Sequence, residues 1–416
     1  MNIRKFVQAN YNYLILTVVF LTLTVGMGVQ STFGVFFTPM SKEFGWDRAT
    51  TSGPFTIYLI VWGLLSIVFG RLSDRVKAWK LISGGAVVLG AGFILMSTVK
   101  NIWQLDIYYG VLVALGISMM HIPLISLVVK HFRKKRGLLT GIALSGVGFG
   151  IAVVPLIASQ LIVSYKWRNA ELSLGIAAIA IIILLAQLLR KPPEPETAEV
   201  ITQTPATTAS VQTDGPTLKD AVKMRAFWMM TIAWFVYGFF YFVPLVHIVP
   251  YAQDLKMTVV AAATVMTLIG LVGIAGRISL GYVGDRLTNR VTFIIAFVGM
   301  AAAFLGLCLS HTIWMLYIFA IIYGFLSGAG ILLTPIVAEY FGVKNVGTVS
   351  GILIAANCFG GALGPFSAGV IYDATNSYVL AFIICVALAV IAGIFYWLMK
   401  QRKTGDTAGI IEKNRG

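Results

Sequence analysis

Charge is scarce in this chain of 416 residues. Only 11% of the residues are Asp, Glu, Lys or Arg, and 58% are hydrophobic, whereas a water-soluble domain carries about 25% charged residues. So few charges cannot cover a water-facing surface of this size, which excludes a large soluble domain. Apolar runs of about 20 residues, the length that crosses the ~30 Å hydrocarbon core of a bilayer, recur along the chain. We therefore expect an integral membrane protein.

Reactive and metal-binding residues are also few. The three cysteines, Cys308, Cys358 and Cys385, lie in apolar runs without CxxC spacing, and the four histidines are far apart. This pattern predicts no disulfide framework and no metal site, and no nucleophile–base or phosphate-loop pattern indicates an enzyme or a cofactor. The net charge of +15 is expected to lie on cytoplasmic loops, so we expect no nucleic-acid partner.

Hydrophobic periodicity predicts twelve spans, interrupted after the sixth by a Pro-, Thr- and Glu-rich segment that cannot bury a core. The spans are 13–37, 54–71, 81–99, 105–130, 138–163, 171–190, 225–252, 258–284, 290–310, 313–341, 346–372 and 378–400. We expect an all-α membrane protein with an N-terminal six-helix bundle (1–190), a cytoplasmic linker (191–224), a C-terminal six-helix bundle (225–400) and a cytoplasmic tail (401–416).

Basic residues predict the orientation, because Lys and Arg concentrate on the cytoplasmic side. With the N-terminus inside, 24 of the 31 basic residues lie inside and Arg277 lies within a span. This distribution predicts a protein of the cell inner membrane with both termini in the cytoplasm. The six basic residues expected outside are Lys42, Arg48, Lys100, Lys166, Arg168 and Lys256.

One loop motif occurs twice. The pattern GxxxDR begins at Gly70 after the second span and again at Gly281 after the eighth, 211 residues later. Two copies at equivalent loops indicate a duplicated six-helix unit, the repeat from which rocking transporters are built. The chain resembles the major facilitator superfamily over its whole length in these features. We expect the motif to form a conformational latch through Asp74, Arg75, Asp285 and Arg286.

The segment His131–Gly150 narrows the resemblance. It reads HFRKKRGLLTGIALSGVGFG, a basic cluster followed by a helix whose glycines at 141, 146 and 150 allow close helix contact or sliding. A basic loop and a packing helix account for most of it. The order of residues is nevertheless similar to the signature YFxKRRxLAxGxAxAGxxxG of the monocarboxylate porter family, and more loosely to that of oxalate–formate antiporters. The resemblance implies transport of short monocarboxylates, such as lactate and pyruvate, usually with a proton.

Arg277 is the only basic side chain expected inside a span, eight positions before Asp285. An ionisable residue in that position is costly and needs a partner, and a guanidinium suits a carboxylate. A structural arginine bound to helix ends is the alternative. The resemblance implies that an arginine in the eighth helix binds the anion. It also implies an aspartate four residues earlier, where this chain has Gly273.

Other polar residues are expected around Arg277. We expect Asn357, Tyr237 and His247 to contribute to substrate binding, and His247 or His121 to carry the proton, because histidine titrates near neutral pH. Packing of these side chains within the helix bundle is the alternative for each. The predicted function is proton-coupled transport of monocarboxylates by alternating access, and we expect a monomer in the lipid bilayer. A carboxylate antiporter and a transporter-like sensor are the alternatives.

Overall fold

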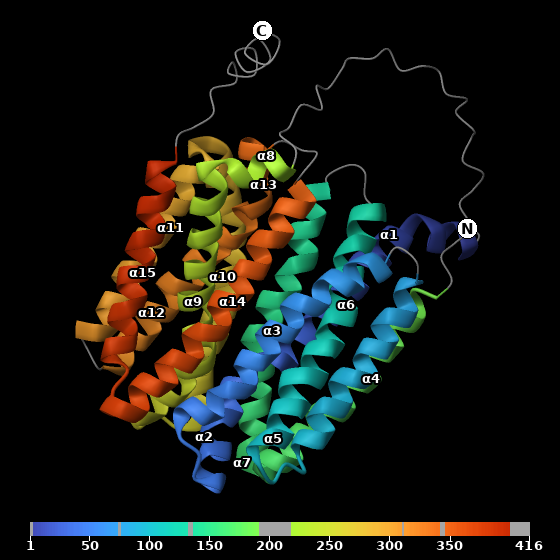
Figure 1. Cartoon of the computed structure of the whole chain (residues 1–416). Helices are drawn as coiled ribbons and strands as arrows, with labels where there is room; N and C mark the ends of the chain where they lie inside the picture. The colour runs from blue at the N-terminus through green and yellow to red at the C-terminus, as the bar shows by residue number, and fades with distance from the viewer. Residues whose placement is uncertain are drawn as a thin grey trace.

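The computed structural model describes residues 3–73, 76–131, 136–190, 218–309, 312–341 and 346–399, and within these ranges every regular element is a helix. The helices run roughly side by side (Figure 1). The all-α expectation is confirmed. Residues 3–190 are called the N-terminal half below, and residues 218–399 the C-terminal half.

The helices of the N-terminal half are α1 (Ile3–Gln30), α2 (Phe33–Phe44), α3 (Arg48–Leu72), α4 (Ala78–Met96), α5 (Ile102–Leu105), the π-helical η1 (Asp106–Val113), α6 (Ala114–His131) and α7 (Arg136–Leu188). Those of the C-terminal half are α8 (Leu218–Lys223), α9 (Arg225–Asp254), α10 (Val259–Leu287), α11 (Asn289–Leu309), α12 (Ile313–Ser327), the 3-10 helix η2 (Gly328–Leu332), α13 (Leu333–Phe341), α14 (Val346–Thr375) and α15 (Val379–Leu398). The short helix α8 lies in the segment predicted as linker.

The described residues contain the twelve expected crossings. Ten helical stretches are long and apolar enough to span a membrane. The stretch within α7 is 48 residues long and is broken at Lys166, whose φ is 64° and ψ 161°, so it supplies two crossings. α3 has polar first turns, but its 25 residues extend about 38 Å at 1.5 Å per residue.

Two crossings predicted as continuous are broken near the middle. α1 gives way to α2 at Ser31 and Thr32, whose hydroxyls bond the carbonyls of Gly28 and Val29, each at 2.7 Å. Such bonds compete with the regular helical pattern. In the tenth crossing the α-helix changes to the 3-10 helix η2 over residues 328–332. This segment contains two glycines, and glycine is a poor helix former. Both breaks are short and lie inside long apolar runs, so hydropathy averaged over the length of a span does not reveal them.

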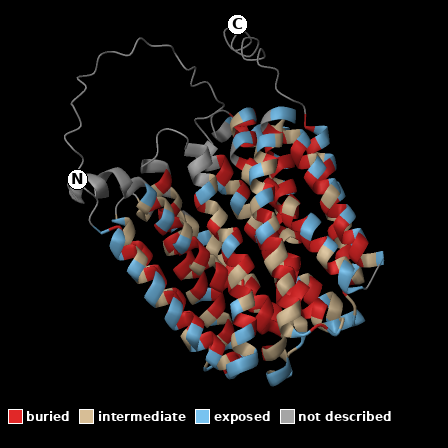
Figure 2. Ribbon diagram, turned by 180° about the vertical axis from the view of Figure 1, so that it is seen from behind, coloured by how far each residue is buried: buried red, intermediate tan, exposed pale blue. Residues whose placement is uncertain are grey.

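Buried apolar residues form two clusters, one drawn almost entirely from residues 15–189 and the other almost entirely from residues 221–399. Figure 2 shows buried residues concentrated between the helices and exposed ones on the outward faces. Many exposed residues are large and hydrophobic, including Trp103 at 74%, Leu184 at 69% and Leu309 at 77% exposure. An outer surface of this kind faces lipid, and the chain is an integral membrane protein.

The glycines predicted to line one strip of α7 have different surroundings. A Cβ on Gly150 would lie 2.9 Å from the backbone nitrogen of Gly28, and one on Gly146 would lie 3.2 Å from the Cα of Phe20. These two glycines therefore allow α7 to pack closely against α1. Gly141 has nothing within 4 Å of its Cβ position. Residues 132–135 of the same motif lie outside the described residues.

Candidate functional site

The two halves meet along helix pairs that cross the middle of the molecule. α7 contacts α10, where Thr267 donates a 2.7 Å hydrogen bond to the carbonyl of Ala152. α3 contacts α14, where Thr56 donates a 2.8 Å bond to the carbonyl of Ala362. Each of these hydroxyl-to-carbonyl bonds joins a helix of one half to a helix of the other.

A cavity of about 200 Å³ lies beside this interface. Aromatic and aliphatic side chains form most of its wall, and none of the described residues that line it is Asp, Glu, Lys or Arg. Gln30, at the break between α1 and α2, is one of the polar residues of the wall. The others are Ser31, Tyr58, Trp62, His121 and Tyr241. All of these except Tyr241 belong to the N-terminal half.

Arg277 projects from α10 toward α7. Its Nη1 atom is buried and has no hydrogen-bond partner among the described residues. A Cβ on Gly148 of α7 would lie 2.7 Å from that nitrogen, so the glycine makes room for the guanidinium. Gly148 lies between the cavity-lining Val147 and Ile151. The guanidinium therefore approaches the cavity wall from the C-terminal half, although Arg277 is not itself among the lining residues.

Two predicted site residues hold helices of the C-terminal half together. Tyr237 donates a 3.1 Å hydrogen bond to the carbonyl of Ser327, which precedes Gly328, whose Cβ position lies 3.0 Å from the Cα of Arg277. Asn357 donates a 3.2 Å bond from Nδ2 to the carbonyl of Trp234. Tyr237 thus bonds to the segment that packs against the backbone of Arg277, whereas Asn357 links α14 to α9. Neither residue lines the cavity.

The two candidate histidines have different environments. His247 is fully buried, with Nδ1 2.8 Å from the Tyr378 hydroxyl and Nε2 2.7 Å from the carbonyl of Pro365. A carbonyl only accepts, so Nε2 carries the hydrogen of that bond. Both ring nitrogens are therefore engaged, which favours the packing role. His121 lines the cavity, with its ring edge-on to Trp62 at a centroid distance of 5.8 Å.

The predicted latch falls largely on residues that the structure leaves undescribed. Asp74 and Arg75 lie outside the described residues, as does the side chain of Asp285. Arg286 is exposed, and its guanidinium stacks over the Tyr282 ring at 4.8 Å. The latch stays a prediction.

A charged cluster joins the halves at the end of the molecule opposite the start of α1 and the end of α15 (Figure 1). Arg48, which begins α3, forms a 2.7 Å ion pair with Asp254 at the end of α9 and donates a 2.6 Å bond to the Tyr378 hydroxyl. Asp373 of α14 accepts bonds of 2.8 and 2.7 Å from the backbone N–H groups of Arg48 and Ala49. We call these five residues the lock, because they hold α3 against the C-terminal half.

The lock was not predicted from the sequence. The Tyr378 hydroxyl shares its bonds between Arg48 and His247. One signal was visible: a basic residue begins the second span, and acidic residues end the seventh and the eleventh. Their pairing over 206 residues could not be read from spacing.

The family profile of the Major Facilitator Superfamily matches residues 18–309 and 280–414. Monocarboxylate transporter 13 of Rattus norvegicus is 25% identical over 385 residues, which cover 91% of this chain and 86% of the relative. Monocarboxylate transporter 12 of Homo sapiens is 26% identical over 435 residues, covering 95% and 83%.

Two solved structures share the fold. Both are of a bacterial homologue of the human lysosomal transporter Spinster in an inward-facing conformation. The unoccupied form superimposes with a TM-score of 0.72 at 17% identity, covering 93% of this chain and 96% of that one. The occupied form gives 0.73 at 17% identity, covering 94% and 97%. The chain belongs to the Major Facilitator Superfamily, a family of transporters and not of enzymes, and it is related to the monocarboxylate transporters of that family.

Proposed function

We propose that this protein is a secondary active transporter of monocarboxylates and that the substrate anion binds Arg277. The observation that carries this proposal is the buried Nη1 of Arg277, which has no partner among the described residues. An unpaired charge in a dry environment is costly. A carboxylate supplies the missing partner, because its two oxygens match the planar fork of a guanidinium.

The absence of charge around the cavity favours a single carboxylate. A dicarboxylate needs a second cation, and the described residues that line the cavity include no Lys or Arg. The curated relatives are named monocarboxylate transporters, which supports the same substrate class. An antiporter of the oxalate–formate type is the second candidate, supported by the motif in α7.

We propose that transport is coupled to a proton. The position four residues before Arg277 is Gly273, where α10 packs against α12: a Cβ there would lie 3.3 Å from the carbonyl oxygen of Gly324. No carboxylate is available at that position. His121 is a better placed candidate than His247, because it lines the cavity and His247 uses both nitrogens within the protein.

The orientation and the division into domains belong to the same proposal. Both termini lie in the cytoplasm, residues 191–224 link two six-helix bundles, and the membrane is the cell inner membrane. Alternating access then opens the lock on the outer side and the GxxxDR loops on the inner side in turn. Reporter fusions at Thr207 and Trp167 test the orientation: the first is expected to be cytoplasmic and the second external. A cytoplasmic signal at Trp167 contradicts it.

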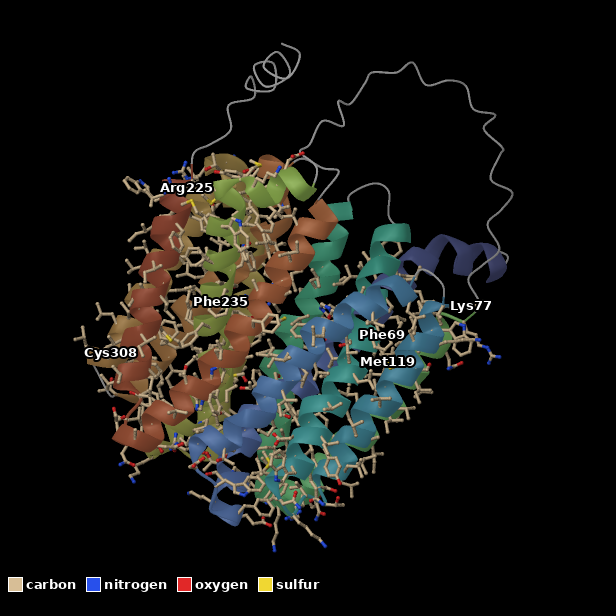
Figure 3. All side chains as sticks on the ribbon, in the orientation of Figure 1. Phe69, Lys77, Met119, Arg225, Phe235 and Cys308 are labelled. Atoms are coloured by element: carbon tan, nitrogen blue, oxygen red, sulfur yellow. The ribbon has the colours of Figure 1, made fainter. Side chains whose placement is uncertain are left out.

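The function is tested by counterflow in proteoliposomes that contain the full chain. We expect exchange of labelled lactate, pyruvate or related monocarboxylates. An inward proton gradient should drive their accumulation, and a protonophore should abolish it. The Arg277→Ala variant should not transport, whereas Arg225→Ala, which removes an exposed arginine at the start of α9 (Figure 3), should transport normally. Exchange of oxalate without any response to the proton gradient favours the antiporter.

A further inference from the structure

The cavity is larger than the smallest monocarboxylates need. A space of about 10–15 Å³ holds one water molecule, so a volume of about 200 Å³ accepts a solute with roughly ten or more non-hydrogen atoms. Lactate is smaller than that. Phe55 and Phe242 contribute apolar walls, and such walls favour an apolar body over further charge.

Two hydrogen-bond donors without partners belong to this wall. Tyr58 and Trp62 lie one turn apart on α3, with their rings stacked at a centroid distance of 6.0 Å. The Tyr58 hydroxyl and the Trp62 Nε1 are both buried, and neither has a hydrogen-bond partner among the described residues. The indole N–H can only donate, so it needs an acceptor. Buried donors are nearly always paired in folded proteins, and an acceptor on a bound solute provides the pair.

His121 adds a third polar group on the facing helix. It projects from α6 into the cavity and contacts Trp62 edge-on. The three side chains thus form one uncharged polar surface on the N-terminal half. Tyr241 lines the cavity from the C-terminal half. The Arg277 guanidinium meets α7 at Gly148, next to the lining residue Val147, so a solute whose carboxylate binds Arg277 extends along the cavity toward Tyr58 and Trp62.

We infer that Tyr58, Trp62 and His121 form a second subsite, which binds the uncharged body of the substrate. The substrate is then a monocarboxylate with an aromatic or branched apolar body that carries a hydroxyl or keto oxygen. This inference rests on the proposed function, because it takes the carboxylate to lie at Arg277. The solute contacts both halves, so its binding favours the conformations in which they are close.

The test is a calorimetric titration of the purified full chain with three acids: lactate, 3-phenyllactate and 3-phenylpropionate, which lacks the hydroxyl. The wild type should bind 3-phenyllactate at least about tenfold more tightly than lactate, because the ring adds apolar contact. Tyr58→Phe and Trp62→Phe should each lower the affinity for 3-phenyllactate by about 2- to 10-fold, the usual effect of losing one neutral hydrogen bond. Tyr58→Phe should leave the binding of 3-phenylpropionate unchanged. Trp62→Phe also removes part of the apolar wall, so it should weaken the binding of 3-phenyllactate more than that of 3-phenylpropionate.

Tyr396→Phe is the matched control, because the Tyr396 hydroxyl accepts a 2.9 Å bond from Trp234, away from the cavity. It should bind all three acids as the wild type does. The inference is overturned if lactate binds as tightly as 3-phenyllactate, or if Tyr58→Phe and Trp62→Phe bind 3-phenyllactate normally. If Arg277→Ala binds all three acids normally while Tyr58→Phe still weakens 3-phenyllactate, the anion site fails and the subsite stands.

Discussion

The C-terminal half brings a positive charge to the centre of the molecule, whereas the N-terminal half brings an uncharged aromatic wall. Among the described residues, Arg277 has a buried nitrogen without a hydrogen-bond partner, and on the other side the Tyr58 hydroxyl and the Trp62 indole nitrogen are also buried and unpaired. The charged group is a single side chain inserted beside a glycine of the opposite half. The uncharged groups are spread over α3 and α6.

This difference assigns two tasks to two surfaces. A charge attracts any small anion, so Arg277 alone distinguishes few substrates. The aromatic wall discriminates by shape and by hydrogen bonding, because a buried donor left unpaired penalises the wrong solute. Binding strength is therefore expected to depend mainly on the C-terminal half, and selectivity mainly on the N-terminal half.

The largest effect is expected at Arg277. Arg277→Ala removes the charged partner, and such truncations cost about 2–5 kcal/mol, roughly a 30-fold to several thousand-fold loss of affinity. Arg277→Lys keeps the charge but lacks the fork, so it should bind weakly. Titration of the purified, folded variants with monocarboxylates measures both. Normal affinity in Arg277→Ala would remove the C-terminal half from anion binding.

A smaller loss is expected when the space for the guanidinium is filled. In Gly148→Ala the new Cβ would lie 2.7 Å from Arg277 Nη1 and 3.0 Å from the carbonyl oxygen of Gly270. Overpacking of this kind costs about 1–3 kcal/mol, roughly 5- to 150-fold in affinity. Gly141→Ala on the same helix is the control, because nothing lies within 4 Å. Equal binding by the two variants contradicts the proposed fit.

The lock is expected to act on conformation more than on binding. Arg48→Ala removes the ion pair with Asp254 and the bond to Tyr378. The equilibrium between the closed and the open conformations of this end should therefore shift toward the open one by about 1–2 kcal/mol, roughly 5- to 30-fold. Distances between spin labels at Lys42 and Asn376, in the two halves, measure the shift.

The control for the lock is an ion pair at the same end that stays within one half. Arg168 and Glu43 form a 2.7 Å pair in the N-terminal half. Arg168→Ala should leave the distance between the labels unchanged. An equal shift in both variants means that general loosening, and not the lock, controls this end of the molecule.

The smallest effect on affinity is expected from the buried histidine of the C-terminal half. His247→Ala removes two hydrogen bonds inside the protein, so it should lower the free energy of unfolding by about 1–3 kcal/mol and leave the proton dependence of transport intact. His121→Ala should alter that dependence with little loss of stability. Thermal unfolding measures the stability of each variant, and uptake at several pH values measures its proton dependence. If His247→Ala alters the proton dependence and His121→Ala does not, His247 is the proton carrier.

The features that could be predicted are those that follow from the order of residues along the chain. Twelve apolar runs predicted the membrane crossings, and Arg277 was singled out because it is the one basic residue inside an apolar run. The breaks at Ser31 and in 328–332 were missed because each is short and lies inside a long apolar run. Tyr58 and Trp62 were missed because an aromatic residue in a membrane helix has many packing partners. Only the fold shows that their polar atoms have no hydrogen-bond partner in the part of the chain that the structure describes.

The lock shows the same limit for charges. Arg48, Asp254 and Asp373 were each visible as residues at span ends, but the contact between α3 and the ends of α9 and α14 requires the arrangement of the two halves. Asn357 illustrates the opposite case. It was expected to contribute to substrate binding, and its amide donates a hydrogen bond to the carbonyl of Trp234, within the C-terminal half.

A structure of the protein with bound 3-phenyllactate tests the central claim most directly. A carboxylate oxygen should lie about 2.7–2.9 Å from a guanidinium nitrogen of Arg277. The ring should lie in the cavity, with the hydroxyl facing Tyr58 or Trp62. A carboxylate held elsewhere, with Nη1 of Arg277 bonded to a protein carbonyl, contradicts the division of tasks between the two halves.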